Sequence, residues 1–528
     1  MRKIKTLLIL LFGVYSFGFS QSAGLPLNEF YKQEFLRHSG KIVHENLFPA
    51  NETQLDLHRT ISDTTVQYSS FTHWLLQSHW VQFEKENTTL YISPLIDFSI
   101  GDDVNRSSKD KAKLFRNVRG AFVSGSIGDK FSFLFSFAEN QARFMDFETN
   151  YFKQSGEYYV KTGGYNRVNA VIPGGSRTKD FKVDAFDYAY SIGMVNYQAT
   201  KRLRFEFGNQ NNFVGAGYRS LLLSDHTIAA LGLRTTYQFS KKWSYQWLIK
   251  NHRNLYRKPK TKFVESPYEN KLYSAVYMTY KPIKSFAVSL FSGANALIGD
   301  SLIKHSLQWQ SALPIPIINT DIALNNNKIM NGIVGLNLEW ALEKWRFYGQ
   351  VVADRLNVGT GIAGQLGVYY FDAFSIKNWM IQLESNIVPK NFYADDNSKL
   401  SYSNAQLALA HPKGNNFAEI LFRTSYEWKR FYASFTGIFY QNLNKSDLGE
   451  LGSNAIISQN VMAVTPQELE YATHYEKIEL GYRFNRKYNG TIYFSFTNRI
   501  STDGTNKSIQ QFVMAGLRTS LFNQYFDF

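Results

Sequence analysis

The stretch that decides the fold is TIYFSFTNR, at residues 491–499. One series of alternate positions is apolar and contains Ile492, Phe494 and Phe496. The other series is mostly polar and contains Thr491, Tyr493, Ser495, Thr497 and Arg499. Because successive side chains of a strand point to opposite faces, the stretch predicts a strand with one apolar face. That face packs on a core in a soluble sandwich. In an outer-membrane barrel it contacts lipid, and the polar face lines the lumen.

The same alternation recurs along the chain. It predicts about eighteen strands, the first near residues 88–100 and the last near 507–522. Charged residues recur on the polar face, and the opposite face is almost continuously aromatic or aliphatic. An apolar face of that kind favours contact with lipid over contact with water.

Connection lengths give a second, independent indication. Short turns, such as those at Gly128 and Lys429, alternate with long connections. An even number of strands with short turns at one end and long loops at the other is typical of bacterial outer-membrane barrels. We therefore predict an all-β fold, a transmembrane antiparallel β-barrel of about 18 strands over residues 87–528. The long connections, expected to be external, are 142–184, 210–226, 252–269, 298–329, 391–415 and 444–472.

One feature of the last strand does not fit this pattern. Val513, Ala515 and Leu517 share one face, whereas Phe522 and Phe526 fall at the other parity. Either a β-bulge near Phe522 restores the alternation, or the terminal residues hang free.

Residues 1–20 have the pattern of a cleaved secretory signal peptide, with three basic residues before an apolar run that ends at Phe19. The alternative is a short N-terminal membrane anchor. Residues 21–86 differ from the rest of the chain, because Phe30, Tyr31 and Phe35 recur at helical spacing. Residues 70–82 are a second candidate helix. We predict that residues 21–86 form a small, partly helical periplasmic or plug-like segment.

Composition supports an exported membrane protein. The 528 residues carry a formal net charge of +15, contain no cysteine and are 16% aromatic. The lack of cysteine excludes disulfides and a lipoprotein anchor. After Ser20 no stretch approaches the ~18 uninterrupted apolar residues of a transmembrane helix. These features indicate the outer membrane of a Gram-negative cell, reached through a cleaved signal peptide.

Catalytic signals are weak. Ser224, Asp225 and His226 are consecutive, and adjacent residues cannot all converge on one centre. The sequence has no glycine-rich phosphate loop and no zinc-ligand spacing. We therefore expect no enzyme activity, no cofactor and no metal site.

The most distinctive stretch is GAGYRSLLLSD at residues 215–225, and its candidate functional residues are Gly215, Gly217, Tyr218, Arg219 and Asp225. The two glycines permit a sharp turn. Tyr218 and Arg219 then project towards the lumen or the rim, where Arg219 contacts carboxylates. Alternatively, the loop folds inward and braces the barrel wall, with Arg219 paired to an internal acid such as Glu206.

A basic cluster is the second candidate site. It consists of Arg253, Arg257, Lys258, Lys260 and Lys262. Basic loops at a cell surface favour polyanions. The alternative is ordinary solvation of charged residues. The expected partners are outer-membrane lipid and either an anionic surface polysaccharide or proteins of a motility or secretion machinery. We expect no nucleic acid partner.

The GAGYRSLLLSD stretch resembles a segment of Bacteroidota outer-membrane proteins similar to the gliding-motility protein RemB. More distantly, the chain is similar to the Wzi family of capsule-assembly barrels. The segments SPLIDF at 93–98 and NVRG at 117–120 also look like their counterparts in these families. The resemblance implies an eighteen-strand barrel with an N-terminal helical segment at the periplasmic mouth. It implies a role in gliding or in attaching capsular polysaccharide to the cell surface, and it carries no catalytic residues.

Together these observations predict a non-enzymatic outer-membrane barrel that serves gliding motility or surface-polysaccharide attachment. The alternative is a porin-like diffusion channel for small solutes, because about eighteen strands enclose a water-sized lumen unless something fills it.

Overall fold

The computed structural model describes most of the chain after residue 27. The described residues are 28–44, 47–49, 70–105, 113–161, 164–175, 178–257, 268–299, 309–320, 330–354, 361–395, 397–443, 471–519, 523 and 525–528. The predicted signal peptide, residues 1–20, lies outside the described residues.

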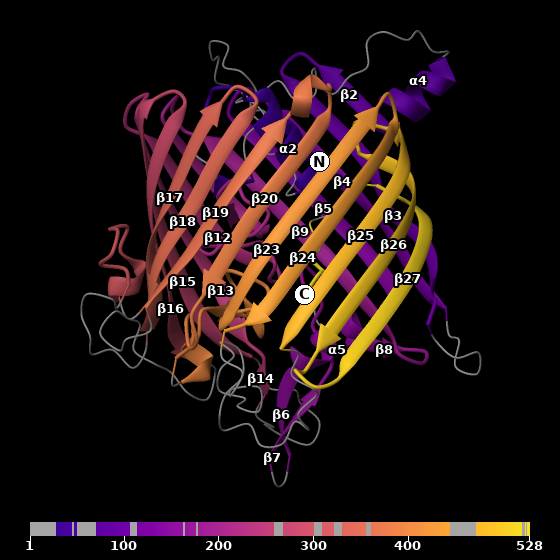
Figure 1. The fold of residues 1–528 in the computed structure, drawn as a ribbon. Coiled ribbons are helices and arrows are strands. Elements are labelled where there is room, and N and C mark those ends of the chain that lie inside the picture. The colour runs from indigo at the N-terminus through magenta and orange to yellow at the C-terminus, as the bar shows by residue number, and fades with distance from the viewer. Residues whose placement is uncertain are drawn as a thin grey trace, which may run out of the picture.

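Eighteen strands in the described part of the chain close into one antiparallel barrel, with β27 paired to β3 (Figure 1). The predicted fold class is confirmed, because each predicted strand has a counterpart in the barrel. The strands are β3 (Thr88–Asp103), β4 (Leu114–Ile127), β5 (Phe131–Arg143), β9 (Ala185–Gln198), β10 (Leu203–Gln210), β12 (Ala230–Gln238), β13 (Trp243–Asn254), β15 (Glu269–Ile283), β16 (Phe286–Gly299), β17 (Met330–Leu342), β18 (Trp345–Asp354), β19 (Ile362–Phe371), β20 (Trp379–Val388), β23 (Phe417–Trp428), β24 (Phe431–Asn442), β25 (Ala472–Asn485), β26 (Gly490–Thr502) and β27 (Lys507–Arg518).

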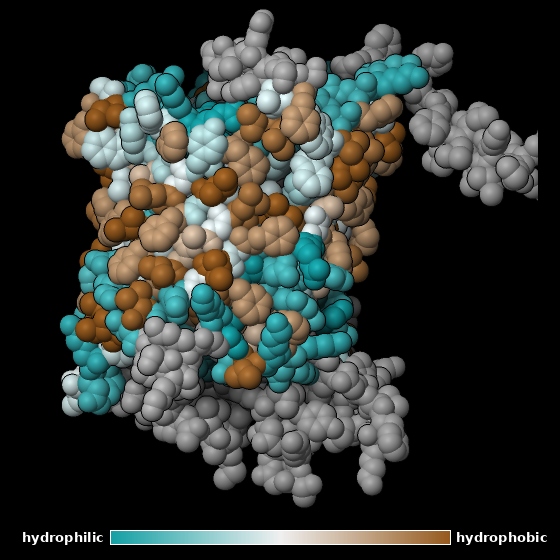
Figure 2. All heavy atoms as spheres, turned by 90° about the vertical axis from the view of Figure 1, so that its right-hand side faces the viewer, coloured by the Kyte–Doolittle hydropathy of each residue, from teal (hydrophilic) through white to brown (hydrophobic). Residues whose placement is uncertain are grey.

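The two faces of β26 have the environments that the alternation in its sequence predicts. Ile492 and Phe494 are 53% and 51% exposed on the outside of the barrel, whereas Ser495 and Arg499 are buried inside it. Figure 2 shows apolar side chains gathered across the middle of the face that it presents, with hydrophilic surface above and below. The outer face thus has the polarity of a lipid-facing wall. Among the described helices, none has the length and apolar character needed to cross a bilayer.

The two ends of the barrel differ. At the short-turn end, uppermost in Figure 1, neighbouring strands are joined by short turns such as residues 128–130 and 429–430. The opposite, long-loop end carries the smaller elements α5 (Asp146–Gln154), β6 (Glu157–Lys161), β7 (Gly164–Val168), β8 (Lys179–Phe181) and β14 (Tyr256–Arg257) (Figure 1). The remaining short elements are β1 (Leu47–Phe48), β11 (Phe213–Val214), η2 (Trp309–Ala312), η5 (Ala373–Ser375), η6 (Ser398–Leu400), β21 (Ser403–Asn404) and β22 (Leu407–Ala408).

Helix α2 (Glu29–His38) lies inside the short-turn end of the barrel (Figure 1). Asn28 caps it by accepting a hydrogen bond from the backbone N–H of Phe30 at 2.8 Å. Acidic Glu29 in the first turn and basic residues in the last turn also suit the helix dipole. Phe35 and Leu36 are buried, so this helix fills part of the lumen.

The second predicted helix, residues 70–82, is only partly correct. Helix α4 ends earlier (Ser70–Gln77), and a strand follows it, β2 (Val81–Lys85). In β2, Val81 pairs with Ile92 of β3. The expected boundary at residue 87 therefore falls inside a β2–β3 hairpin that belongs to the barrel wall.

The last strand ends at Arg518, four residues before its expected end. Beyond it, Phe526 and Phe528 are both buried inside the barrel, so these terminal residues do not hang free. Phe522, where a bulge is predicted, lies outside the described residues. We call residues 523–528 the C-terminal tail, and its described aromatic side chains follow the packing of the lumen and not the alternation of the wall.

Candidate functional site

Residues 211–229, between β10 and β12, fold into the lumen; we call them the inward loop. Its Val214 N–H donates to the Leu223 carbonyl at 2.9 Å, which closes the loop on itself. Gly215 has a φ of +109°, and a Cβ at Gly217 would lie 2.8 Å from Oε2 of Glu384. A positive φ and a close approach to the wall both favour glycine. The two glycines therefore allow the loop to pack against β20.

Arg219 is the centre of the inward loop and is only 1% exposed. Its Nη2 lies 2.9 Å from Oδ1 of Asp527 and donates to the hydroxyl of Tyr440 at 2.7 Å. Its Nε lies 3.4 Å from Oε2 of Glu419. One guanidinium therefore joins the inward loop to β23, β24 and the C-terminal tail.

Arg219 thus lies inside the barrel and braces the wall, as the second of the two interpretations has it. The predicted ion pair between Arg219 and Glu206 is wrong. Glu206 faces Arg234 directly across the β10–β12 pair, and their side chains lie 2.5 Å apart. A cross-strand neighbour on the same face is closer than any residue of the loop, so it takes the carboxylate.

Tyr218 strengthens the same junction. The backbone N–H groups of Tyr218 and Arg219 donate to the two carboxylate oxygens of Glu384, at 2.7 and 3.1 Å. The Tyr218 hydroxyl donates to Oδ2 of Asp527 at 2.7 Å. Burial raises the pKa of Tyr218 well above its ordinary value, so the phenol stays protonated and serves as a donor.

Asp225 anchors the other end of the motif. Its Oδ2 accepts a hydrogen bond from Nδ2 of Asn523 at 2.9 Å. Burial raises the pKa of Asp225 to about 6, against the opposing effect of hydrogen bonds from Asn523 and Tyr525. Its neighbour His226 faces the Tyr151 hydroxyl at 2.8 Å. This direction differs from the one a Ser–His pair needs.

A second long connection also enters the lumen. Residues 389–416 follow β20, and within them the Tyr393 hydroxyl donates to the Leu221 carbonyl at 2.6 Å. The Tyr402 hydroxyl donates to the Leu222 carbonyl at 2.9 Å. The expectation that connections 210–226 and 391–415 are external is therefore wrong. Their tyrosines and leucines bury apolar surface inside the barrel, which offsets the cost of ordering the loops.

The C-terminal tail ends in an aromatic cluster near the long-loop end. Phe528 stacks on Tyr151 of α5 with ring centroids 3.7 Å apart. Phe526 packs against Phe144 and Phe152, with ring centroids 5.6 and 5.1 Å apart. These contacts hold the end of the tail against α5 and Phe144.

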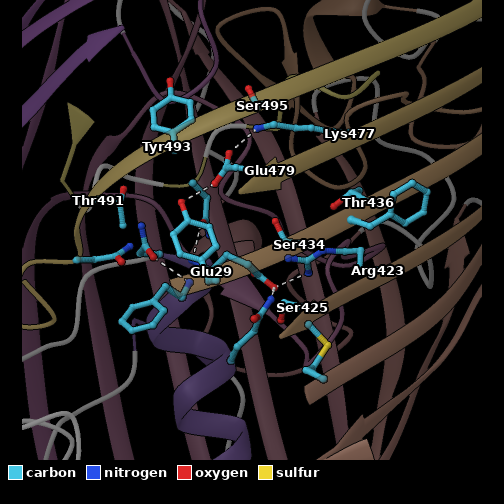
Figure 3. Close-up of a pocket in the computed structure, with 18 of the residues that line it drawn as sticks. Glu29, Arg423, Ser425, Ser434, Thr436, Lys477, Glu479, Thr491, Tyr493 and Ser495 are labelled. Atoms are coloured by element: carbon cyan, nitrogen blue, oxygen red, sulfur yellow. Dashed lines mark hydrogen bonds and ion pairs between the residues drawn. The ribbon is translucent and has the colours of Figure 1, made fainter. Parts of the chain in front are cut away.

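Between α2, the tail and strands β23–β27 lies a cavity of about 420 Å³ (Figure 3). Its lining extends from Asn378 and Asn489, beside the short turns, to Asp527 of the tail. A volume of this size is typical of sites for small ligands. It is the candidate binding site of the described chain.

The cavity is lined by paired charges and tyrosines. Arg423 donates to Oε1 of Glu29 at 2.7 Å, and its guanidinium lies 4.1 Å from the Tyr218 ring centroid. Glu479 accepts a hydrogen bond from Tyr432 at 2.9 Å and lies 3.2 Å from Nζ of Lys477. Figure 3 shows Glu29 of α2 beside Arg423, with Lys477 and Glu479 reaching in from the barrel wall. The site thus offers many donors and acceptors together with aromatic faces.

The two groups of predicted site residues have different positions. Gly215, Gly217, Tyr218, Arg219 and Asp225 come together inside the lumen, and Tyr218 also lines the cavity. Arg253 is exposed on β13 at the long-loop end. The side chain of Arg257 is not described, and the cluster's three lysines, Lys258, Lys260 and Lys262, lie outside the described residues. Polyanion binding by this cluster stays a prediction.

Sequence reasoning missed the acids that hold the motif. Glu384, Glu419 and Asp527 lie between 165 and 308 residues from Arg219 along the chain. The only available signal was that Glu384 and Glu419 fall on the polar face of predicted strands. Among the described residues, no group of three or more His, Asp or Glu side chains is arranged to hold a metal ion.

Comparisons with known proteins identify the fold. No family model matches the sequence, and no curated protein matches it. Among solved structures, the chain is similar to Escherichia coli Wzi, an outer-membrane protein involved in group 1 capsule assembly and described as a carbohydrate-binding β-barrel. The TM-score is 0.52 at 13% identity, over 95% of this chain and 100% of Wzi. Pseudomonas aeruginosa OccD3 gives a TM-score of 0.42 at 12% identity, over 87% of this chain and 98% of OccD3. The similarity to Wzi shows that the chain has the fold of an outer-membrane β-barrel.

Proposed function

We propose that this chain is a non-enzymatic outer-membrane barrel with a filled lumen that helps to hold a polysaccharide at the cell surface. The observation that carries the proposal is the cavity among the inward segments. It combines tyrosine faces with Arg–carboxylate pairs, which suit a ligand rich in hydroxyl and acidic groups.

The fold similarity to Wzi supports the proposed polysaccharide binding, because that protein is described as a carbohydrate-binding barrel involved in capsule assembly. The sequence resemblance to RemB-like proteins adds gliding motility as a second setting for a surface polysaccharide. In both settings the barrel acts as a scaffold, and the predicted basic cluster that begins at Arg253 supplies contacts to acidic sugars.

The test in cells is a deletion of the gene, scored together for retained surface polysaccharide and for colony spreading. Shed polysaccharide is the result we expect. Lost spreading with normal polysaccharide would instead assign the barrel to a motility or secretion machinery. If deletion changes neither trait, the proposal is wrong.

The test in vitro is binding of extracted surface polysaccharide to the purified barrel, measured by calorimetry. Lys477→Ala removes an ammonium group that lines the cavity, and its side chain is one-third exposed, so we expect weaker binding with little loss of stability. The matched control is Lys507→Ala, which removes an exposed lysine at the start of β27, at the long-loop end of the barrel. Equal affinities for the two variants would locate the binding site outside the cavity.

The diffusion-channel alternative makes a different prediction. A channel gives a stable open state when the protein is reconstituted in a planar bilayer. The inward loop, residues 389–416 and the tail occupy the lumen, so we expect no stable conductance.

A further inference from the structure

Nine exposed aromatic side chains surround the short-turn end of the barrel. We call them the aromatic girdle: Phe131, Tyr197, Phe239, Trp243, Trp340, Trp345, Phe374, Trp428 and Phe431. Several are stacked on a neighbour from the adjoining strand, as in Trp345 and Tyr370, whose ring centroids lie 3.9 Å apart. Aromatic residues gather at the level of lipid headgroups at both rims of membrane barrels. The girdle therefore marks the headgroup level at this rim.

No turn joins the last strand to the first, so the seam between β27 and β3 differs from the other strand pairs at the short-turn end. Strand β27 ends where Arg518 pairs with Asp97, whereas β3 continues towards the short-turn end as far as Thr88. The free edge of β3 is covered by β2, in which Phe83 pairs with Leu90. Val81 and Phe83 of β2 are both exposed on the outer face. Strand β2 thus completes the wall beside the seam.

Helix α4 precedes β2 and projects outward above the seam (Figure 1). Its exposed apolar residues are Phe71, Trp74 and Leu75, at positions i, i+3 and i+4, so they form one stripe. Phe71 is 68% exposed, and Trp80 just after the helix is also exposed. A stripe of this size facing water would cost free energy, so it needs an apolar partner.

The helix is fixed to the barrel at its C-terminal end. Nδ2 of Asn485 donates to the carbonyls of Leu75 and Ser78, both at 3.0 Å. Buried His79 lies 2.7 Å from the hydroxyl of Ser93 on β3. Nε1 of Trp74 donates to the Trp80 carbonyl at 2.9 Å. These contacts hold the apolar stripe outward and at the end of the barrel where the girdle lies.

We propose that helix α4 and Trp80 are an interfacial membrane anchor that binds the phospholipid headgroup region beside the β27–β3 seam. The anchor adds aromatic residues to the girdle at the seam, where no turn joins β27 to β3. Its amphipathic stripe enters the headgroup and upper acyl region, as interfacial helices do. The inference rests on the proposed outer-membrane location, and it adds a lipid-binding element outside the barrel strands.

The chain has no cysteine, so a single introduced thiol can be labelled without background. We would replace Phe71 with Cys, attach an environment-sensitive fluorophore, and reconstitute the full-length barrel in vesicles of phosphatidylethanolamine and phosphatidylglycerol. His73→Cys, on the opposite side of α4, is the matched control, and Phe374→Cys reports the girdle itself. Because Phe71, His73 and Phe374 are exposed, each variant is expected to fold, which the heat-dependent gel shift of the barrel checks.

The expected result is a blue-shifted signal at position 71 that shallow nitroxide-labelled lipids quench as strongly as at position 374. At position 73, aqueous iodide should quench more strongly than lipid. If position 374 is quenched by lipid and position 71 only by iodide, the anchor proposal is wrong. If lipid quenches the fluorophore at neither position 71 nor position 374, the proposed membrane location is wrong.

Discussion

Arg219 is the residue on which the inward loop, the wall and the tail converge. Its guanidinium lies beside two carboxylates, of Asp527 and Glu419, and next to the Tyr440 hydroxyl. All four side chains are buried. A buried charge pair adds little net stability compared with an apolar core, but removing one partner leaves the other charged group without compensation.

We predict that Arg219→Ala lowers the free energy of unfolding by about 3–5 kcal/mol, because two buried carboxylates lose their cation. Arg219→Lys should recover only part of this loss, since an ammonium cannot contact both carboxylates in one plane. Urea titration of the folded barrel in vesicles measures the effect. Arg253→Ala, at an exposed position, is the control and should change stability by less than about 0.5 kcal/mol. Equal losses at 219 and 253 would contradict the network.

A second prediction concerns the pH dependence at Asp225. Burial raises its pKa in the folded protein to about 6, above the ordinary value near 4 of an unfolded chain. The folded state therefore binds the proton more tightly, and this carboxyl group contributes stability as pH falls through 6. Between pH 7 and pH 5 the wild-type protein should gain about 1 kcal/mol relative to Asp225→Asn. Unfolding curves of both proteins at the two pH values provide the measurement, and parallel profiles would refute the assignment.

At the scale of elements, strand β26 and the C-terminal tail follow different rules. The strand alternates because one side meets lipid and the other meets the lumen. The tail is not part of the barrel wall. Phe528 packs on Tyr151 of α5, and Phe526 packs on Phe152 of the same helix. The described residues of the tail are thus held by side-chain packing and by the contacts of Asp527.

Removing the two tail aromatics should release the tail. We predict that Phe526→Ala combined with Phe528→Ala exposes the C-terminus to carboxypeptidase, because each truncation removes a large buried side chain worth about 3–5 kcal/mol. The wild-type barrel should resist digestion over the same period. Phe494→Ala, on the outer face, is the control that should leave the tail protected. Rapid digestion of the wild-type tail would show that the packing is weaker than the structure implies.

The outer face of β26 gives another element-scale prediction. Phe494→Arg should destabilise the barrel in vesicles by about 2–4 kcal/mol if this position lies near the bilayer midplane. Ile509→Arg is the matched control, because Ile509 is similarly exposed but lies near the long-loop end of β27. Its cost should be about 0–1 kcal/mol. The reverse order of the two costs would place the bilayer at a different level.

At the scale of the whole molecule, an eighteen-strand barrel is wide enough to hold water, and that space is occupied by helix α2, the inward loop, residues 389–416 and the tail. Arg219 joins the inward loop to the tail, and the Leu221 and Leu222 carbonyls join it to residues 389–416, so the lumen behaves as a second core inside the wall. The cavity lies between these segments and the wall. This arrangement suits a scaffold or a binding protein better than an open pore.

We therefore predict that the wild-type barrel does not conduct ions and that a designed variant with an emptier lumen does. The wild-type protein should give no stable conductance in a planar bilayer. Replacing residues 391–415 with a short Gly–Ser linker, together with removal of residues 525–528, should produce open-channel currents because both changes empty the lumen. Stable wild-type currents would contradict the filled lumen, and a silent designed variant would show that the inward loop and helix α2 are enough to block it.

The sequence by itself determined the wall of this protein. Alternation at positions such as Ile492 and Phe494 has a local cause, since a strand presents its two faces to lipid and lumen residue by residue. The alternation of short turns and long connections then predicted the strand number and the closed barrel.

Only the tertiary structure decided what fills the wall. Whether residues 389–416 lie outside or inside depends on partners such as Leu221 and Leu222, which are distant in the chain. The same holds for Arg219, whose partner Asp527 is 308 residues away, whereas the suggested partner Glu206 was already paired across a strand. Buried charges and loops choose their partners by three-dimensional proximity, and no local periodicity in the sequence records that choice.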